Sequence, residues 1–242
     1  MGRTWGAVAV VAVLGSASAV AVAAAGGGGG ATSAQAPVRY EQSDLYIEYN
    51  ATAGDAGLQL GLDAEDWRQF TLLDTKGRRL AEVDARGRLR SFGLTELFFE
   101  AAEPSFKELP FREFKKRIPE GTYRFRGVDV DGRRVIGSDR LTHVIPAAPK
   151  VTFPTRGARV DPSNFKVTWE SVTRPAGVRI VSYQVIVRQG ERELSMYLPS
   201  TATSATIPPE FVRSGTALTG ELLARERSGN QTITEFPTFR SA

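Results

Sequence analysis

The chain has 242 residues, of which 41 % are hydrophobic and 24 % charged, and its formal net charge is +4 at pH 7. This length suits one large or two small domains. The absence of cysteine excludes disulfides, thiolate nucleophiles, iron–sulfur clusters and cysteine-bearing zinc sites. Basic and acidic residues alternate along the sequence, and no basic cluster is interleaved with aromatic residues. We therefore expect no nucleic-acid partner.

Residues 1–25 have the layout of a signal peptide. Arg3 supplies the positive start, residues 7–14 are apolar, and Ala21 and Ala23 fit the small-residue cleavage rule. We expect an exported protein that is periplasmic, at the cell surface or secreted. The alternative is an uncleaved membrane anchor, and only in that case do we expect membrane contact. The Ala, Gly and Ser residues that follow Leu14 argue against an anchor, because they contribute little to membrane insertion.

Residues 26–39 are rich in Gly, Ala and Ser and predict a flexible spacer, because they offer few side chains that could build a core. Residues 40–145 predict a first β-sandwich module. Alternating apolar runs indicate strands at residues 45–49, 58–62, 67–73, 79–83, 94–99, 123–127, 135–136 and 141–145. The turn sequence at residues 74–77 predicts a hairpin between two of these strands.

Residues 110–117 predict one short helix in the first module. Pro110 suits the first helical position, and Phe111, Phe114 and Ile118 fall on one face. Basic residues occupy the other side and the last turn, where they favour the helix dipole. We interpret this basic face as solvated; a contact surface for an acidic partner is the alternative.

Residues 146–149, Pro-Ala-Ala-Pro, predict a stiff linker through which no strand can continue, because proline lacks a backbone donor. Residues 150–240 predict a second sandwich. Its strands are expected at residues 165–169, 180–187, 194–198, 218–224 and 232–236. The fold class is therefore all-β, with two tandem antiparallel β-sandwich modules.

About residues 147–240 resemble a fibronectin type III domain. The resemblance rests on Pro149 before the first strand, Trp169, Tyr183 in the third strand, and the turns at residues 214–216 and 228–230. In that family a tyrosine near the start of a late strand ties its hydroxyl to the backbone, and Leu218 or its neighbour stands there in this chain. The whole chain resembles uncharacterised exported bacterial proteins with such domains. The resemblance implies a binding or spacer role and carries no catalytic residues.

The single histidine, His143, falls near a strand end beside the linker. A Ser-His-Asp arrangement would have to use it, and one histidine without cysteine offers too few ligands for a typical zinc site. We expect a half-exposed strand histidine.

Clustered acidic residues are the remaining candidates for chemistry, since a carboxylate pair can act on sugars and oxygen-rich loops suit calcium. They are Asp63, Glu65 and Asp66; Glu100 and Glu103; and Asp129 and Asp131. Asp and Gly also favour tight turns, and we interpret these acids as turn residues. The sequence thus predicts no enzyme, no catalytic residue, no cofactor and no metal ligand.

The predicted function is that of an exported non-enzymatic binding or scaffolding protein at the cell envelope, with an unidentified protein or glycan partner. One alternative is a carbohydrate-binding or enzyme-accessory module in which Trp67, Tyr197 or Phe239 forms an exposed aromatic platform. A purely structural envelope protein is the other.

Export gives a direct prediction. N-terminal sequencing of the mature protein is expected to start between Ala19 and Pro37, because the cleavage motif and the spacer lie in that interval. A mature chain that keeps Met1 and partitions with membranes would instead identify residues 1–25 as an anchor.

Overall fold

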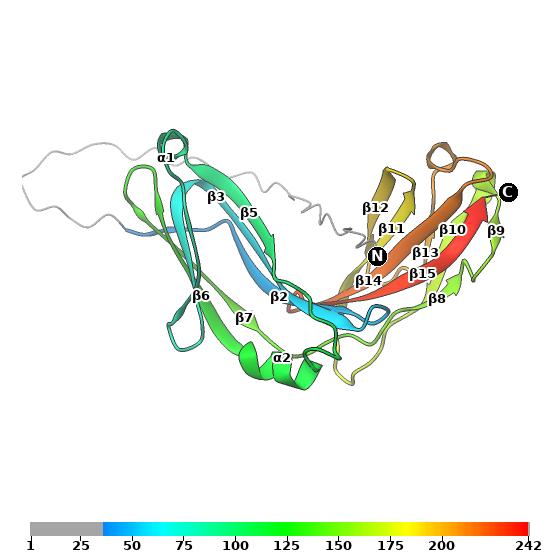
Figure 1. Ribbon diagram of the computed structural model, residues 1–242, viewed down its shortest axis with the longest axis horizontal. Helices are drawn as coiled ribbons and strands as arrows, with labels where there is room; N and C mark the ends of the chain where they lie inside the picture. Colours follow the sequence, from blue (N-terminus) through cyan, green and yellow to red (C-terminus); the bar gives the residue numbers. More distant parts are fainter. Residues whose placement is uncertain (1–35, 242) are drawn as a thin grey trace, which may run out of the picture. The chain divides into compact units, whose positions relative to one another are not determined.

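The longest strand, β3 (Asp55–Leu73), organises the first module (Figure 1). The structure is a computed structural model that describes residues 36–241. The first half of β3 lies between β2 (Gln42–Asn50) and β5 (Leu94–Glu100), and its second half between β4 (Arg79–Asp84) and β6 (Gly121–Asp129). The pairing registers shift between Asp63 and Gln69, where the strand passes from one sheet to the other.

The two sheets of this module therefore share one strand and enclose one core. β7 (Arg134–Leu141) pairs with β6, and β1 (Val38–Arg39) pairs in parallel with β7. The sequence predicted separate strands at residues 58–62 and 67–73, which was wrong, because one strand, β3, includes both ranges and the residues between them. The predicted strand at residues 141–145 was also wrong: β7 ends at Leu141, and the next strand begins after the linker.

Helix α2 (Phe111–Arg117) is formed as the sequence predicts. Phe114 is buried, and Phe111 packs on Phe114 and on Tyr49 of β2 with ring centroids 5.8 and 5.1 Å apart. A second helical turn, α1 (Leu89–Phe92), carries no buried residue, and Phe92 is 77 % exposed.

The second module is an antiparallel β-sandwich of two sheets, as expected from the sequence. Its smaller sheet has the order β8 (Lys150–Phe153), β10 (Lys166–Glu170) and β13 (Ser204–Thr206). The facing antiparallel sheet runs through β12 (Arg192–Pro199), β11 (Ile180–Gln189), β14 (Ala217–Glu226) and β15 (Gln231–Ser241). A two-residue strand, β9 (Arg159–Val160), pairs in parallel with the end of β15. Two short 3₁₀ turns, Pro162–Asn164 and Pro209–Phe211, connect strands.

The core of the second module centres on Trp169 and Tyr183, whose ring centroids lie 5.4 Å apart. Trp169 is 3 % exposed, and Val167, Val185 and Val187 are buried beside it, so the predicted register is confirmed.

The backbone tie that the family makes with a tyrosine occurs in the first module. The Tyr123 hydroxyl donates a hydrogen bond of 2.9 Å to the carbonyl of Pro119. In the second module Leu218 is buried in the core at the place expected for that tyrosine.

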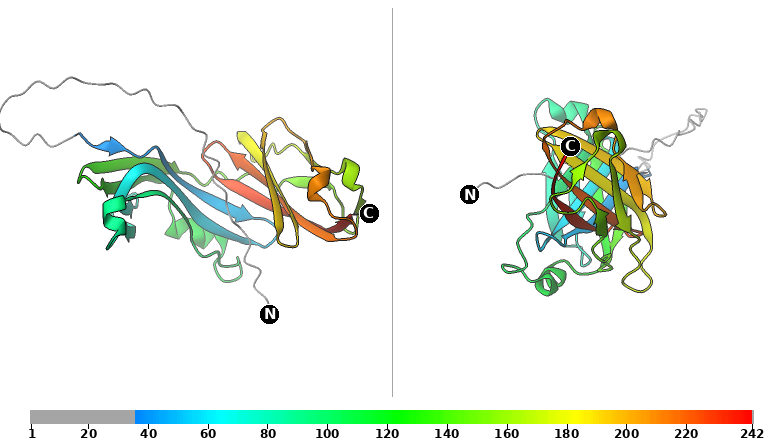
Figure 2. Two further views of the ribbon diagram at one scale, coloured as in Figure 1. Left: turned by 90° about the horizontal axis from the view of Figure 1, so that it is seen from above. Right: turned by 90° about the vertical axis from the view of Figure 1, so that its right-hand side faces the viewer.

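The two modules meet where β2 pairs in parallel with β15 (Figures 1 and 2). Glu48, Tyr49 and Asn50 of β2 stand opposite Gln231, Thr232 and Ile233 of β15. No strand passes through residues 146–149, yet this pairing joins sheets of both modules into one hydrogen-bonded path.

No helix within residues 36–241 is long and apolar enough to cross a membrane. The leader and nearly all of the spacer, residues 1–35, lie outside the described residues.

The core position of Trp169 gives a stability prediction. Trp169→Ala in the full chain is expected to lower the free energy of unfolding by about 3–5 kcal/mol, because it leaves a large cavity against Tyr183. Chemical denaturation followed by circular dichroism measures this loss. Tyr197→Ala, at a half-exposed tyrosine, is the control and should cost much less. Equal effects of the two substitutions would refute the assigned core.

Candidate functional site

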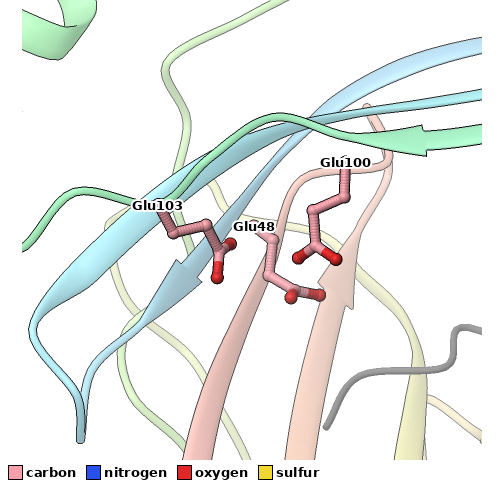
Figure 3. A group of neighbouring side chains, drawn as sticks. All are labelled: Glu48, Glu100 and Glu103. Carbon is pink, nitrogen blue, oxygen red and sulfur yellow. The ribbon is translucent and has the colours of Figure 1, made fainter. Parts of the chain in front are cut away.

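Three glutamates come together beside the module junction (Figure 3). Glu48 lies on β2, Glu100 ends β5, and Glu103 lies in the segment that follows β5. One carboxylate oxygen from each residue lies within 4.8 Å of the others. Glu48 is buried, Glu103 is half-buried and Glu100 is exposed, so the group reaches from the interior to the surface.

Strand β3 positions these side chains. Glu48 stands opposite Gly57 across the β2–β3 pair, and Glu100 stands opposite Gln59 across the β3–β5 pair. Residues two apart on a strand share a face, so Gly57 and Gln59 bring both glutamates to the same side of the sheet.

Glycine at position 57 leaves room for Glu103. A Cβ atom built on Gly57 would lie 2.6 Å from Oε1 and 2.7 Å from Cγ of Glu103. Contacts this short do not occur between real side chains, so any larger residue would displace Glu103 from the cluster.

Two glutamine side chains contact the cluster. Gln231 Nε2 of β15 donates a hydrogen bond to Glu48 Oε2, and Gln59 Nε2 donates one of 3.2 Å to Glu100 Oε1. Gln59 is 1 % exposed and Glu48 is 5 % exposed. Buried oxygens without a hydrogen-bond partner also gather here, and they belong to Asp55 (Oδ1), Gln59 (Oε1) and Glu103 (Oε1).

Burial, together with the negative charges of Glu100 and Glu221, raises the pKa of Glu48 to about 7, although the hydrogen bond from Gln231 lowers it. Burial likewise raises the pKa of Glu103 to about 8, with added repulsion from Glu100, Glu48 and Asp55. The pKa of Glu100 is also raised, chiefly by burial, while a hydrogen bond with Glu103 opposes that rise. The cluster thus holds protons near neutral pH, since charging all three groups at once is unfavourable.

Two kinds of chemistry suit this arrangement: sharing a proton between carboxyl groups, or holding a cation through oxygen ligands. Hydrolysis of a sugar needs two carboxyl groups facing a bound ring, and Glu48, which is buried under Gln231, does not face such a space.

Of the other acidic residues singled out in the sequence, Asp129 is a turn residue, as interpreted, whereas Asp63, Glu65 and Asp66 lie within strand β3 and not in a turn. Asp129 Oδ2 accepts a hydrogen bond of 2.6 Å from Arg133 Nε, and Asp129 Oδ1 accepts one of 2.8 Å from the Arg133 amide. Asp131 also forms an ion pair with Arg133, in which Oδ2 of Asp131 lies 3.6 Å from Nη2 of Arg133. These contacts stabilise a tight turn and leave no open carboxylate pair. Asp63, Glu65 and Asp66 form no metal-type group with one another within the described part of the chain.

His143 is half-buried just beyond the end of β7. Its Nε2 donates a hydrogen bond of 2.8 Å to the Ile118 carbonyl, and its backbone amide donates one of 2.5 Å to Glu120. His143 therefore connects the end of β7 to the segment that follows α2. Neither of these two hydrogen bonds involves a serine that the imidazole could activate.

The proposed aromatic platform is not formed. Trp67 and Phe239 are fully buried in the two cores, and Tyr197 is the single half-exposed member of the three. The alternative of an exposed aromatic platform is therefore not supported, because Trp67 and Phe239 lie on the faces of their strands that join the core.

Sequence reasoning found Glu100 and Glu103 but missed Glu48, Gln59 and Gln231. In β2, Leu45 and Ile47 point into the core, so alternation places Glu48 on the outer face. Its burial arises from β15, which lies far away in the sequence, and no local signal reveals that contact.

No family model matches the chain, and no curated protein matches it. Among solved structures, the chain is similar to a segment of two fibronectin type III domains from chicken tenascin, with 10 % sequence identity and a TM-score of 0.30. That match covers 83 % of this chain and 98 % of the tenascin segment.

The raised pKa values predict how stability depends on pH without added cations. The folded-state pKa values of Glu48 and Glu103 lie above their usual value of 4.5, so their contribution is full below about pH 4.5 and is lost as the pH rises through about 7 and about 8. For Glu48 alone the loss is roughly 3 kcal/mol. The melting temperature in chelator is therefore expected to fall between about pH 4.5 and about pH 8.

Glu48→Gln should remove much of this fall, because an amide does not ionise. Glu96→Gln, on the exposed face of the same strand as Glu100, is the control and should leave the pH profile unchanged. A profile that keeps its full slope in Glu48→Gln would contradict the assignment of the slope to the cluster.

Proposed function

We propose that the chain is an exported, non-enzymatic protein whose two joined β-sandwiches bind or scaffold a protein or glycan partner at the cell envelope. The leader-like residues 1–25 support export. The fibronectin type III-like fold suggests a binding or scaffolding module, because loops and sheet faces sit on a stable framework.

The observation that carries this proposal is the junction. Asn230 precedes β15 and is fully buried. Its Oδ1 accepts a hydrogen bond of 2.8 Å from the Ile47 amide of β2. Its Nδ2 donates bonds of 2.9 and 3.0 Å to the carbonyls of Thr142 and Val144, just ahead of the linker.

Further bonds continue along the same contact. The Thr232 hydroxyl donates to the Pro146 carbonyl at 2.7 Å, and the Ala51 amide donates to the Ile233 carbonyl at 3.0 Å. Tandem domains joined by a linker alone move against each other by default. A shared strand pair and a buried polar clamp favour a fixed spacing, which is what a scaffold or a two-module binding surface requires.

The carbohydrate-binding alternative has lost its main support, because Trp67 and Phe239 are core residues. A purely structural role remains a distinct proposal. A structural role would also require the fixed junction between the modules. It differs from the binding role because the protein would then bind no partner.

Loosening the junction tests the proposal. Asn230→Ala is expected to destabilise the full chain, because each buried group left without a partner costs about 1–3 kcal/mol. Spin labels at Lys76→Cys and Glu191→Cys, one in each module, can be placed without interference in this cysteine-free chain. Their distance distribution should be narrow with Asn230 and broader with Asn230→Ala.

Asn164→Ala, at an exposed asparagine, is the matched control and should keep the narrow distribution. Immobilised full-length chain is expected to retain an envelope protein or glycan, with weaker retention by Asn230→Ala than by Asn164→Ala. A broad distribution in the parent chain would remove the support for scaffolding, and a cytoplasmic location would overturn the proposal.

A further inference from the structure

The glutamate cluster beside the junction carries an inference beyond a scaffolding role. Its three carboxylates come from β2, the end of β5 and the following segment, and their ligand oxygens lie within 4.8 Å of one another (Figure 3). Oxygen atoms this close, each able to carry negative charge, repel one another unless protons or a cation lie between them.

A second observation points independently to a ligand. Gln59 is almost completely buried, and its Nε2 lies 3.2 Å from Glu100 Oε1, so its amide is directed into the cluster. Its Oε1 has no hydrogen-bond partner. Buried amide oxygens are nearly always paired in proteins, so this open oxygen, on an amide that contacts the cluster through its nitrogen, marks a place for a positively charged group.

We propose that Glu48, Glu100, Glu103 and the Gln59 amide oxygen form a Ca²⁺-binding site that connects β2, β3 and β5 next to the module junction. This assignment departs from the sequence expectation, which gave Glu100 and Glu103 to turn chemistry and predicted no metal ligand.

The chemistry of the donors selects the metal. All four are oxygen ligands, whereas zinc and other transition metals favour nitrogen and sulfur. Ca²⁺ accepts carboxylates and amide oxygens in irregular geometry, while Mg²⁺ demands near-ideal octahedral geometry and keeps most of its water. The exposed side at Glu100 leaves room for water to complete the coordination of Ca²⁺.

The position of Glu103 in the site depends on residue 57 being glycine. Glu103 lies against the bare face of Gly57, so a methyl group there would move this ligand and change no charge. The position therefore offers a test of geometry that is separate from tests of charge.

The test uses the full chain freed of metal with chelator, at about pH 8 so that protons compete less for the carboxylates. Titration calorimetry with CaCl₂ is expected to show one site, with a Kd of about 10⁻⁴–10⁻³ M as in extracellular modules. Saturating Ca²⁺ should raise the melting temperature by several degrees, because it binds the folded state. MgCl₂ at the same concentration should have a much smaller effect.

Glu103→Gln and Gly57→Ala are each expected to weaken Ca²⁺ binding by roughly tenfold or more. Glu96→Gln on the same strand as Glu100 should bind Ca²⁺ as the parent chain does. Should Glu103→Gln fail to fold, Glu100→Gln at the exposed member gives the same readout.

Absence of calorimetric heat and of any thermal shift at millimolar Ca²⁺ would overturn the proposal. Equal responses to Ca²⁺ and Mg²⁺ would overturn the choice of metal, and unchanged Ca²⁺ binding in Glu103→Gln would overturn the location of the site.

Discussion

The parallel pairing of β2 with β15 is the contact on which the rest of this structure depends. It joins sheets of both modules, and it buries Glu48 under Gln231. Asn230 reinforces the pairing from the adjacent turn, where its side chain bonds to the Ile47 amide. At the ends of a strand pair, backbone groups lack a partner on the other strand and bond to water instead. At one end of this pair, the buried side-chain amide of Asn230 bonds to such backbone groups. The position of the carboxylate cluster and the fixed spacing of the modules both follow from this contact.

Much of the fold could be predicted because its signals are local. Alternation in β11 and β10 placed Tyr183 and Trp169 correctly in one core, and the spacing of Phe111 and Phe114 identified α2. The continuity of β3 could not be read in the same way. Its acidic segment between residues 63 and 66 resembles a turn, but β3 continues through it, at the place where the neighbours of the strand change. The strands that pair with β3 before and after this segment come from elsewhere in the chain, and the local sequence pattern gives no information about them.

In the candidate site, too, the residues with a local sequence signal were predicted and those that depend on distant contacts were missed. Glu100 and Glu103 stand out in the sequence because they are close neighbours beside two phenylalanines. Glu48 carries no such signal: alternation assigns it to the solvent face, where Gln231 of the other module contacts it. Gln59 is missed for a related reason, since a polar residue in an apolar strand normally faces water. A side chain that is buried by a contact from the other module gives no sign of that burial in the pattern of its own module.

The distance along the chain between the paired strands has a consequence for how the protein is assembled. The bond from Gln231 to Glu48 closes a separation of 183 residues, as does the bond between Asn230 and Ile47. Closing so long a loop is slow compared with forming hairpins such as β6–β7. During synthesis from the N-terminus, Glu48 is therefore expected to stay hydrated until the last strand emerges. The junction would then be completed late, after the first core has formed on its own local contacts and together with the second core, to which β15 supplies Phe236 and Phe239.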